Sequence, residues 1–434
     1  MYVIIFIYIQ FFTILTTTCK TCDSLTRSEV ESHLGTKTPY RVLANKIDKE
    51  IKYNGCVPIR MWTVIRHGTR NPSRKFIRQA KENLMKIREK VLGSTKSNLC
   101  SHELAMLRNW SFNVNEDEQK FLVYEGEDEM IELAERFQKR FPNLLPDSYH
   151  PKNYKFKYTA TQRALKSAQS FAVGLFGRHK IRDIYYPQPL HKDPILRFYK
   201  LCNRWDFEVR KNPDAMEEVK RFRDGPEFNE VVKSIAKKTG VQGLTKDDIH
   251  LIFTTCAYET AWNKQRMSPW CSLFTKKGLR VLEFSEDLKY YWIDGYGYDL
   301  TREQACPAFI DMMEHIRPNS IEPNATFYFT HSGTLLKVLA HVGLYKDDFV
   351  LTHADFARPR KWMVSKIDSF GTNLAFITFQ CKIETKVLLM HQEKIVRFPA
   401  CQQEDLCSIK KVEKEYRKSL NNCNFDELCN MSDS

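Results

Sequence analysis

The chain has 434 residues, of which 42% are hydrophobic and 28% are charged, and its formal net charge is +14. This composition is typical of a globular protein with a large core, and it excludes a long disordered tract and a small disulfide-stapled scaffold. The positive charge favours an anionic partner, but the basic residues are spread along the chain without an arginine-rich arm or zinc-finger spacing. We therefore do not expect that partner to be nucleic acid.

The chain begins with an apolar run, MYVIIFIYIQFFTIL, followed by the small polar stretch TTTC. The run is shorter than the ~20 residues of a membrane-spanning helix, and its position favours a secretory signal peptide over residues 1–19. An uncleaved anchor is the alternative, because no Lys or Arg precedes the run. After cleavage we expect no membrane span. The terminal NMSDS is not an endoplasmic reticulum retention signal, so secretion or lysosomal delivery is predicted.

Thirteen cysteines agree with passage through the secretory pathway. None of their spacings fits a zinc site, which favours disulfides, and cleavage after Cys19 leaves an even number. Three Asn-x-Ser/Thr sequons, at Asn109, Asn324 and Asn430, point the same way and predict a glycoprotein.

Strand-like runs alternate with helical patterns along the chain, which indicates an α/β body. The first strand is predicted over residues 61–65, MWTVI, directly before the turn RHGTRNP at 66–72. A helix is predicted within 158–176, with Thr159 or Thr161 as its N-terminal cap. Its apolar face comprises Ala164, Ala168, Phe171 and Leu175, at helical spacing.

From about 186 to 290 the pattern becomes more helical and more charged, with helices broken at Gly225-Pro226 and at Gly240. We predict that 186–290 is a helical cap inserted into a body formed by 35–185 and 291–434. Strand patterns return in TFYFT (326–330), NLAFITFQC and KVLLMH. The predicted fold is therefore α/β, a mixed sheet with helices on both faces plus an inserted, mostly helical cap.

Two strand-to-turn junctions each carry a histidine, His67 in RHGTRNP and His331 in THSGTLL. Ligands of open α/β sheets bind at the carboxyl ends of the strands, where helix N-termini point at anions. Arginine suits bidentate phosphate contact, and a neutral imidazole is a competent nucleophile toward phosphorus. Brought side by side, the two junctions would make a phosphate site with a nucleophile.

RHGTRNP matches the RHGxRxP signature of the histidine acid phosphatases. GTKTPY (35–40), EDLKYYWIDGYGY (286–298) and HVGLYKDD (341–348) resemble segments of the multiple inositol polyphosphate phosphatases, a branch related to the phytases. The resemblance covers nearly all of the mature chain. It implies the histidine phosphatase fold and a phosphomonoesterase of inositol polyphosphates that needs no cofactor and no metal. A broad-specificity acid phosphatase is an alternative within the enzyme class.

The resemblance also implies roles for individual residues. His67 would attack phosphorus and form a phosphohistidine. Gly68 would let the turn backbone approach the phosphate, and Lys75 and Arg78 are further candidates for contact with peripheral phosphates. The implied ligands of the phosphate that is transferred are Arg66, Arg70, Arg163 and His331.

The chain departs from the family pattern beside His331. The inositol polyphosphate branch reads His-Ala-Glu there and the phytases and acid phosphatases read His-Asp, with the carboxylic acid protonating the leaving alcohol. This chain reads His331-Ser332-Gly333, so the proton donor is missing at Gly333. Because a positioned general acid is worth ~10²–10⁴-fold, we expect phosphate binding to survive while alkyl esters are cleaved slowly. A catalytically impaired binder of inositol polyphosphates is therefore the alternative function.

Two further segments, SPWCSLF (268–274) and EKIVRFPAC (393–401), carry the same resemblance and contain cysteines. The resemblance implies three disulfides, which join Cys56 to Cys381, Cys256 to Cys271, and Cys401 to Cys407.

Overall fold

The structure is a computed structural model that describes residues 22 and 24–431, so the predicted signal peptide over 1–19 lies outside the described residues. Its centre is a mixed sheet with the strand order β2-β3-β1-β4-β5-β6, and β7 also pairs with β5. The strands are β1 (Cys56–Arg66), β2 (Tyr154–Tyr158), β3 (Ala325–Thr330), β4 (Asn373–Cys381), β5 (Thr385–His391), β6 (Lys394–Val396) and β7 (Leu406–Ser408).

Strand β1 lies in the middle of the sheet, parallel to β3 and antiparallel to β4. Its buried half, Met61–Arg66, contains the predicted strand 61–65, whereas the outer half from Cys56 is partly exposed. The apolar pattern in the sequence predicted only the half of β1 that is covered on both faces of the sheet. The strands predicted over 326–330 and in NLAFITFQC and KVLLMH are confirmed as β3, β4 and β5.

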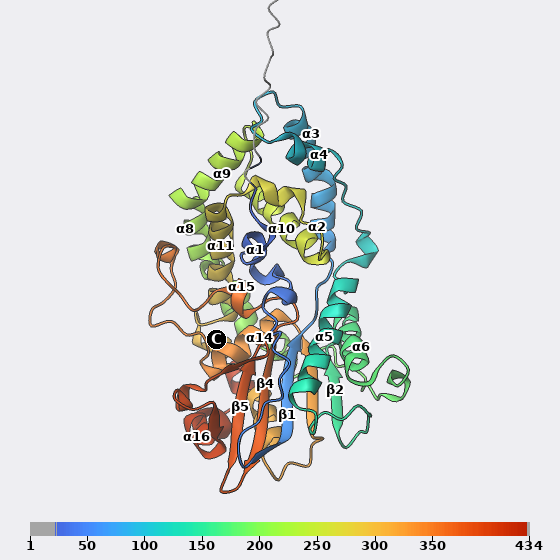
Figure 1. Cartoon of the computed structure of the whole chain (residues 1–434). Helices are drawn as coiled ribbons and strands as arrows, with labels where there is room; N and C mark the ends of the chain where they lie inside the picture. Colours follow the sequence, from blue (N-terminus) through green and yellow to red (C-terminus); the bar gives the residue numbers. More distant parts are fainter. Residues whose placement is uncertain (1–21, 23, 432–434) are drawn as a thin grey trace, which may run out of the picture.

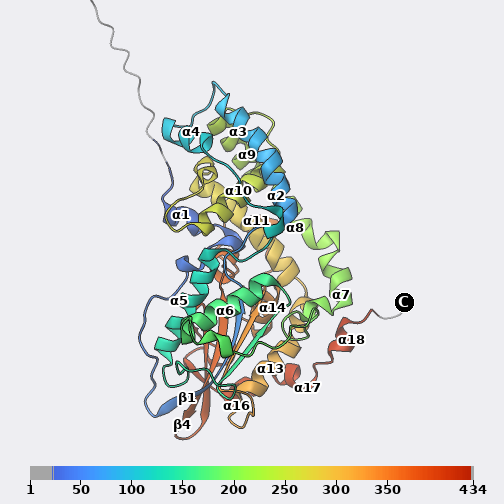
Figure 2. The ribbon, with the colours of Figure 1, turned by 90° about the vertical axis from the view of Figure 1, so that its right-hand side faces the viewer.

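Helices cover both faces of the sheet, as predicted (Figure 2). On one face, α5 (Tyr124–Arg140) and α6 (Gln162–Phe176) bury a core against β2 and β3, in which Phe171 contacts Phe327. On the other face, α13 (Cys306–Ile316) and α14 (Ser332–Val342) pack on β1. Thr161 caps α6, and the predicted apolar face of that helix is buried. The α/β class is confirmed.

A second group of helices lies beyond the carboxyl ends of the parallel strands (Figure 1). Gly225 and Gly240 end two of these helices, where the sequence predicted breaks. The group from the predicted cap contains α8 (Glu217–Asp224), α9 (Pro226–Thr239), α10 (Lys246–Trp262) and α11 (Lys276–Asp294).

Helices from an earlier part of the chain pack on this group. They are α2 (Arg74–Gln79), α3 (Met85–Leu92) and α4 (Ser101–Arg108), and a π-helical turn joins α2 to α3. Lys238 of α9 forms an ion pair of 3.1 Å with Glu103 of α4, and Ser94 donates a hydrogen bond of 3.1 Å to the Gly240 carbonyl. The division of the chain into a cap over 186–290 and a body over 35–185 and 291–434 stays a prediction. From these contacts we propose that the cap also includes residues 74–108.

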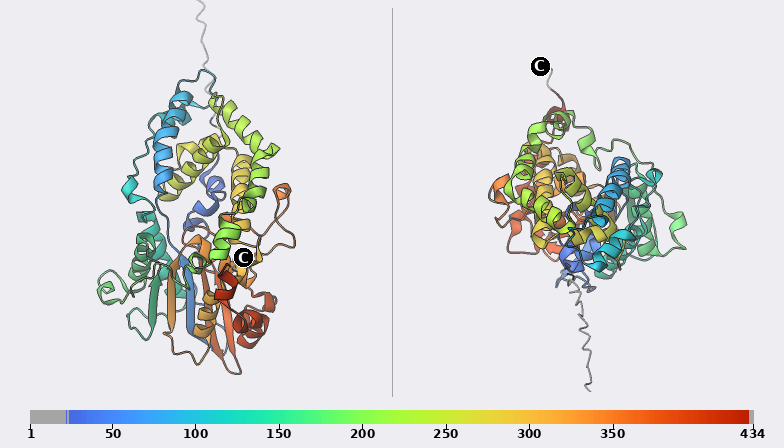
Figure 3. Two further views of the ribbon diagram at one scale, coloured as in Figure 1. Left: turned by 180° about the vertical axis from the view of Figure 1, so that it is seen from behind. Right: turned by 90° about the horizontal axis from the view of Figure 1, so that it is seen from above.

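Short helices complete the chain: α1 (Arg27–Glu31), α7 (Asn203–Trp205), α12 (Asp299–Glu303), α15 (Val364–Ile367), α16 (Ile409–Glu415), α17 (Arg417–Asn421) and α18 (Phe425–Cys429). Figure 3 shows the C-terminal helices beside α7, where Cys202 is bonded to Cys429. Among the described residues, no helix is both long enough and apolar enough to cross a bilayer.

All three disulfides implied by the resemblance are present: Cys56–Cys381, Cys256–Cys271 and Cys401–Cys407. Besides Cys202–Cys429, the structure adds Cys22–Cys100 and Cys306–Cys423. Bonds that close long loops restrict the unfolded chain, and Cys56–Cys381 spans 325 residues across neighbouring strands.

Candidate active site

Three neighbouring parallel strands, β2, β3 and β1, end at the same edge of the sheet. Arg66 of β1 lies in register with Thr330 of β3, so the next residues, His67 and His331, are neighbours. The chain leaving β2 enters α6, which carries Arg163 in its first turn. Topology thus brings together three side chains that the sequence separates by up to 264 positions (331 − 67).

The two histidine rings lie edge to face, with their centroids 5.4 Å apart. Nδ1 of His67 lies 2.9 Å from the Gly68 carbonyl oxygen. A carbonyl only accepts, so Nδ1 carries the proton and the lone pair remains on Nε2. This is the tautomer that a nucleophile toward phosphorus requires.

His331 has the opposite arrangement. Nη2 of Arg163 lies 3.3 Å from its Nδ1, and Oγ1 of Thr159 lies 3.0 Å from its Nε2. Arginine only donates, so Nδ1 accepts and the proton is on Nε2. His331 is therefore held by two partners, with Arg163 beside it.

A cavity of about 280 Å³ opens over these side chains. It brings together all of the phosphate ligands that the resemblance implied, together with His67 and Gly333. Among the described residues, the lining comprises Thr36, Lys37, Arg66, His67, Arg70, Arg163, Arg197, Tyr199, Lys200, Tyr258, Tyr290, His331, Ser332, Gly333 and Phe370. No residue in this lining carries a carboxyl group.

The arginines of the cavity are held mainly through their terminal nitrogens. Nη1 of Arg66 donates to the Thr36 carbonyl at 2.8 Å, and its guanidinium lies over the Phe370 ring, 4.8 Å from the centroid. Each of the four arginines that line the cavity, Arg66, Arg70, Arg163 and Arg197, has a buried Nε without a hydrogen-bond partner among the described residues. Buried donors left unpaired in this way are suited to an anionic ligand.

The concentration of positive charge alters the pKa values in the site. Burial, followed by the charges of Arg163 and other arginines, lowers the pKa of His67 and of His331 well below the ordinary histidine value. Burial, followed by Arg70 and Arg197, lowers the pKa of Arg163 to about 9. The neutral form of both histidines is therefore favoured, and a bound phosphate dianion would compensate the excess charge.

The turn after β1 is clamped onto the start of α5. A Cβ atom at Gly68 would lie 2.4 Å from the Gly126 carbonyl oxygen, so only glycine fits there. From the sequence, a glycine is expected here so that the turn backbone can approach the phosphate. The structure gives another reason, which is the close packing of Gly68 on Gly126. Glu129 of α5 accepts the Thr69 amide at 2.7 Å and its hydroxyl at 2.9 Å, which fixes the turn in place.

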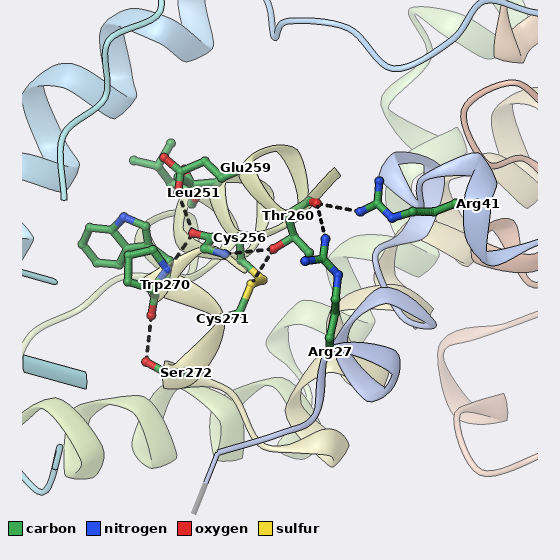
Figure 4. Close-up of a disulfide and its surroundings, with 12 residues drawn as sticks. Arg27, Arg41, Leu251, Cys256, Glu259, Thr260, Trp270, Cys271 and Ser272 are labelled. Carbon is green, nitrogen blue, oxygen red and sulfur yellow. Dashed lines mark hydrogen bonds between the residues drawn. A yellow bond between two sulfur atoms is a disulfide. The ribbon is translucent and has the colours of Figure 1, made fainter. Parts of the chain in front are cut away.

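Helix α10 brings Tyr258 to the cavity, where its hydroxyl accepts a hydrogen bond of 3.0 Å from Nη1 of Arg70. The C-terminal end of α10 is held from outside. Arg27 and Arg41 donate to the Thr260 carbonyl at 3.2 and 2.8 Å, and the Cys256–Cys271 disulfide ties the helix to the next segment (Figure 4). Cations at a helix C-terminus satisfy free carbonyls and complement the dipole, so this end is rigid.

Sequence reasoning missed several cations and aromatic residues of the cavity. Asp193 accepts the amide of Leu196 at 2.8 Å, and the Leu196 carbonyl accepts the hydroxyl of Thr330 at 2.7 Å. These bonds place Arg197 above the end of β3. The only local sequence signal near Arg197 was the pair Asp193-Pro194, which indicates a turn but does not indicate a ligand site. The missed lining residues are Thr36, Lys37, Arg197, Tyr199, Lys200, Tyr258, Tyr290 and Phe370.

The other predicted phosphate candidates, Lys75 and Arg78, are not among the residues that line the cavity. Arg78 instead donates to Glu116 at 2.8 Å on the exposed side of α2. In the part of the chain that the structure describes, no group of three or more His, Cys, Asp or Glu side chains could hold a metal ion. Independence from metals and cofactors remains a prediction.

At the end of β3, no carboxyl group occupies position 333. A Cβ atom at Gly333 would lie 3.3 Å from Oδ1 of Asp294, which forms an ion pair with Lys337. The neighbouring Ser332 donates its hydroxyl to Oδ2 of Asp368. Asp368 is fully buried and also contacts Arg66, with Oδ2 3.5 Å from Nη1.

The chain was compared with known families and proteins. Residues 59–398 match the model of the histidine phosphatase superfamily, branch 2. Multiple inositol polyphosphate phosphatase 1 of Drosophila melanogaster is 31% identical over 406 residues, which cover 89% of this chain and 84% of the relative. The human protein of that name is 28% identical over 444 residues, covering 93% and 90% of the two chains.

Solved structures show the same fold. The phytase of D. castellii aligns with a TM-score of 0.76 at 17% identity, covering 94% of this chain and 89% of that one. The multiple inositol polyphosphate phosphatase of Bifidobacterium longum, in complex with inositol hexasulfate, aligns with a TM-score of 0.66 at 16% identity, covering 90% and 98%. The family model and the relatives agree with the resemblance carried by RHGTRNP, and the chain belongs to branch 2 of the histidine phosphatase superfamily.

Proposed function

We propose that the protein is a phosphomonoesterase that hydrolyses inositol polyphosphates through a phosphohistidine on His67. The observation that carries the proposal is a neutral histidine with a free Nε2, located in a cavity that presents four arginines with unpaired donors. Membership of the histidine phosphatase superfamily agrees with it.

In the first step, Nε2 of His67 attacks phosphorus while the bond to the leaving oxygen breaks. Arg66, Arg70 and Arg163 hold the nonbridging oxygens and stabilise the charge that the transition state places on them. His331 accepts a hydrogen bond from Arg163 through Nδ1 and so holds that arginine beside the phosphate. In the second step, water attacks the phosphohistidine and the electron pair of the N–P bond returns to Nε2.

The substrate class follows from the number of cations around the cavity. Arg197 and Lys200 line it beyond the three arginines of the reacting phosphate, so further phosphates on one substrate would meet charges of opposite sign. Lys37 also lines the cavity, where it forms an ion pair with Glu286. The names of the relatives, multiple inositol polyphosphate phosphatase, and the inositol hexasulfate in the Bifidobacterium complex favour an inositol ring as the carrier of those phosphates.

Gly333 favours a second candidate, an inositol polyphosphate binder with impaired turnover, because the position lacks a carboxyl group. A broad-specificity acid phosphatase is the third, and the cations beyond the reacting phosphate count against it.

We further propose that the protein enters the secretory pathway and is secreted or delivered to lysosomes. Six disulfides among the described residues require an oxidising compartment. The asparagines of the three sequons, Asn109, Asn324 and Asn430, are all exposed and accessible to glycosylation.

The test is turnover and phosphoenzyme formation by the purified protein and its His67→Ala variant. We expect the natural protein to release phosphate from inositol hexakisphosphate and p-nitrophenyl phosphate, and to give an acid-labile phosphoenzyme on rapid quench. The variant should lose both while keeping its circular dichroism spectrum and melting temperature. Turnover by the variant at the natural rate would refute the assignment of His67.

A further inference from the structure

A hydroxyl group and a carboxyl group lie together at the end of β3, beside the position that lacks a proton donor. Ser332 lines the cavity with His67 and donates a hydrogen bond to Oδ2 of Asp368. Asp368 has no exposed surface and is not part of the cavity lining. The pair therefore connects a buried carboxyl group to the cavity through one hydroxyl.

Cleavage of an alkyl phosphate needs a proton on the leaving oxygen, since an alkoxide is a poor leaving group. The cavity lining offers hydroxyl groups but no carboxyl group. The hydroxyl of Tyr258 lies 3.0 Å from Nη1 of Arg70, and burial raises the pKa of Tyr199, which makes that phenol a weaker acid. Tyr290 is the third tyrosine of the lining. Ser332 differs from all three tyrosines because its hydroxyl is hydrogen-bonded to a carboxyl group.

The surroundings of Asp368 favour a protonated carboxyl group. Oδ1 is buried without a partner among the described residues, which is costly for an anion. The charged groups that face it are Arg66, Asp294 and Lys37. Burial outweighs the attraction of Arg66 and raises the pKa of Asp368 to about 7. A phosphate dianion bound at Arg66 would favour the protonated form further.

Asp294 is the competing carboxyl group near this position. It lies beside Gly333, but it forms an ion pair with Lys337, which is itself fully buried. Among the described residues, Asp294 has no hydrogen bond with a hydroxyl group of the cavity lining, whereas Asp368 has one with Ser332.

We propose that Ser332 and Asp368 form the proton relay for the leaving alcohol, an inference that rests on the proposed function. When Asp368 is protonated the hydrogen bond runs the other way: Oδ2–H donates to Oγ of Ser332, and the Ser332 hydroxyl is free to donate to the leaving oxygen. As Nε2 of His67 bonds to phosphorus and the P–O bond breaks, the Ser332 hydroxyl proton moves to the leaving oxygen. The Oδ2 proton of Asp368 replaces it on Ser332, which leaves a carboxylate beside Arg66.

The second step reverses the transfer. Water gives a proton to Ser332 and Ser332 passes one to Asp368, while the hydroxide attacks phosphorus and the N–P bond breaks. Ser332 is thus the catalytic residue that touches the leaving oxygen, and Asp368 acts through it. The two residues after His331 are Ser332 and Gly333, neither of which has a carboxyl group. In this relay the acid comes from Asp368.

The test compares Ser332→Ala and Asp368→Asn with the natural protein on two substrates. Inositol hexakisphosphate has an alkyl leaving group, whereas p-nitrophenyl phosphate has one that departs without a proton. We expect each variant to lose about 10²-fold or more in kcat on the alkyl substrate, with less than about threefold loss on the aryl substrate. Ser332→Ala removes a single oxygen atom from a partly exposed residue, so we expect this variant to fold. It can therefore test the relay by itself if Asp368→Asn does not fold.

Two readouts separate proton transfer from a structural role. Across a series of phosphate esters, the dependence of kcat on leaving-group pKa should be steeper in both variants than in the natural protein. In the natural protein, kcat on the alkyl substrate should fall as pH rises through the pKa of Asp368. This decrease should be absent from the pH profile of Asp368→Asn. Asp311→Asn is the matched control, a half-buried aspartate that accepts from Trp62 at 2.8 Å. It should leave the alkyl-to-aryl ratio unchanged.

Equal losses on both substrates would overturn the relay, since they would indicate that the pair only positions Arg66. Unchanged alkyl turnover in both variants would also overturn it. If the natural protein hydrolyses the aryl ester but no alkyl ester, the relay fails while the His67 chemistry stands. Turnover of neither ester overturns both proposals.

Discussion

The ends of strands β1 and β3 meet in one cavity, yet they differ in how their chemistry is built. At the β1 end the whole motif RHGTRNP is present, and backbone contacts with α5 hold its turn. At the β3 end only His331 is kept, and the residues after it carry a hydroxyl and a hydrogen in place of an acid. In the proposed mechanism, phosphate binding and leaving-group protonation therefore rest on separate residues, and we expect that they can change independently.

The largest effect is expected from Arg163→Ala, which removes a ligand of the phosphoryl group. Arg163 has a buried, unpaired Nε and contacts His331 at 3.3 Å. We expect kcat/KM to fall by about 10²–10³-fold on alkyl and aryl esters alike, because the phosphoryl group is common to both. Steady-state kinetics on both substrates measures it.

The matched control is Arg78→Ala, on a cap helix outside the cavity, where the arginine pairs with Glu116. It should leave kcat/KM unchanged. If Arg163→Ala lost activity only on the alkyl ester, Arg163 would belong to the leaving-group side and the contrast between the two strand ends would fail.

The next effect concerns the β3 end, where Gly333→Glu supplies a new acid. Its Cβ would fit with a shift of a few tenths of an ångström beside Asp294, and that like charge would favour its protonated form. In the Asp368→Asn background we expect alkyl-ester turnover to recover by about 10-fold or more. In the natural background the gain should stay below about tenfold, since the relay already supplies a proton.

Gly333→Gln in the same background is the control, because it has the size of glutamate but no proton to give. It should recover nothing. A gain of several hundredfold from Gly333→Glu in the natural protein would instead mean that no donor is present, which is the outcome that the sequence alone predicts.

Gly68→Ala tests the packing of the β1 end, with a smaller effect. The added methyl group would meet the Gly126 carbonyl oxygen at 2.4 Å, and neither backbone can move freely. We expect a loss of about 1–3 kcal/mol in the free energy of unfolding, measured by chemical denaturation. Gly278→Ala is the control, since its nearest contact is an ordinary 3.4 Å. Equal stability of the two variants would show that the turn is not clamped on α5.

Much of the fold could be predicted from the sequence because local patterns carry it. Strand β3 was predicted over 326–330 and occupies Ala325–Thr330, and α6 starts at the predicted cap Thr161. His67 and His331 could be placed together because parallel strands end at one edge of the sheet. The disulfides Cys56–Cys381, Cys256–Cys271 and Cys401–Cys407 came from the resemblance and not from spacing.

The rest depends on contacts between distant segments. Arg197 lies over the site because the Leu196 carbonyl binds Thr330, a partner 134 positions away. Asp368 meets Ser332 across 36 positions, and nothing in the pattern of either segment indicates this pairing. Residues 74–108 were likewise predicted to belong to the body, because a local pattern does not say which group of helices a segment joins. Local sequence sets the elements, and the long-range packing completes the site.

The smallest effect is a change in one pKa, and it tests how the two strand ends act on each other. Burial is the main cause that lowers the pKa of His67, and the charge of Arg163 is the next. Removing a cation stabilises the imidazolium, so Arg163→Ala should raise the pKa of His67 toward its ordinary value. NMR titration of the His67 ring in the ligand-free protein measures the shift, and Arg78→Ala should give none. Because the remaining burial still disfavours the charged ring, we expect the pKa to stay below 6.5. An unchanged pKa would mean that desolvation alone keeps His67 neutral, and that the arginines serve only the phosphate.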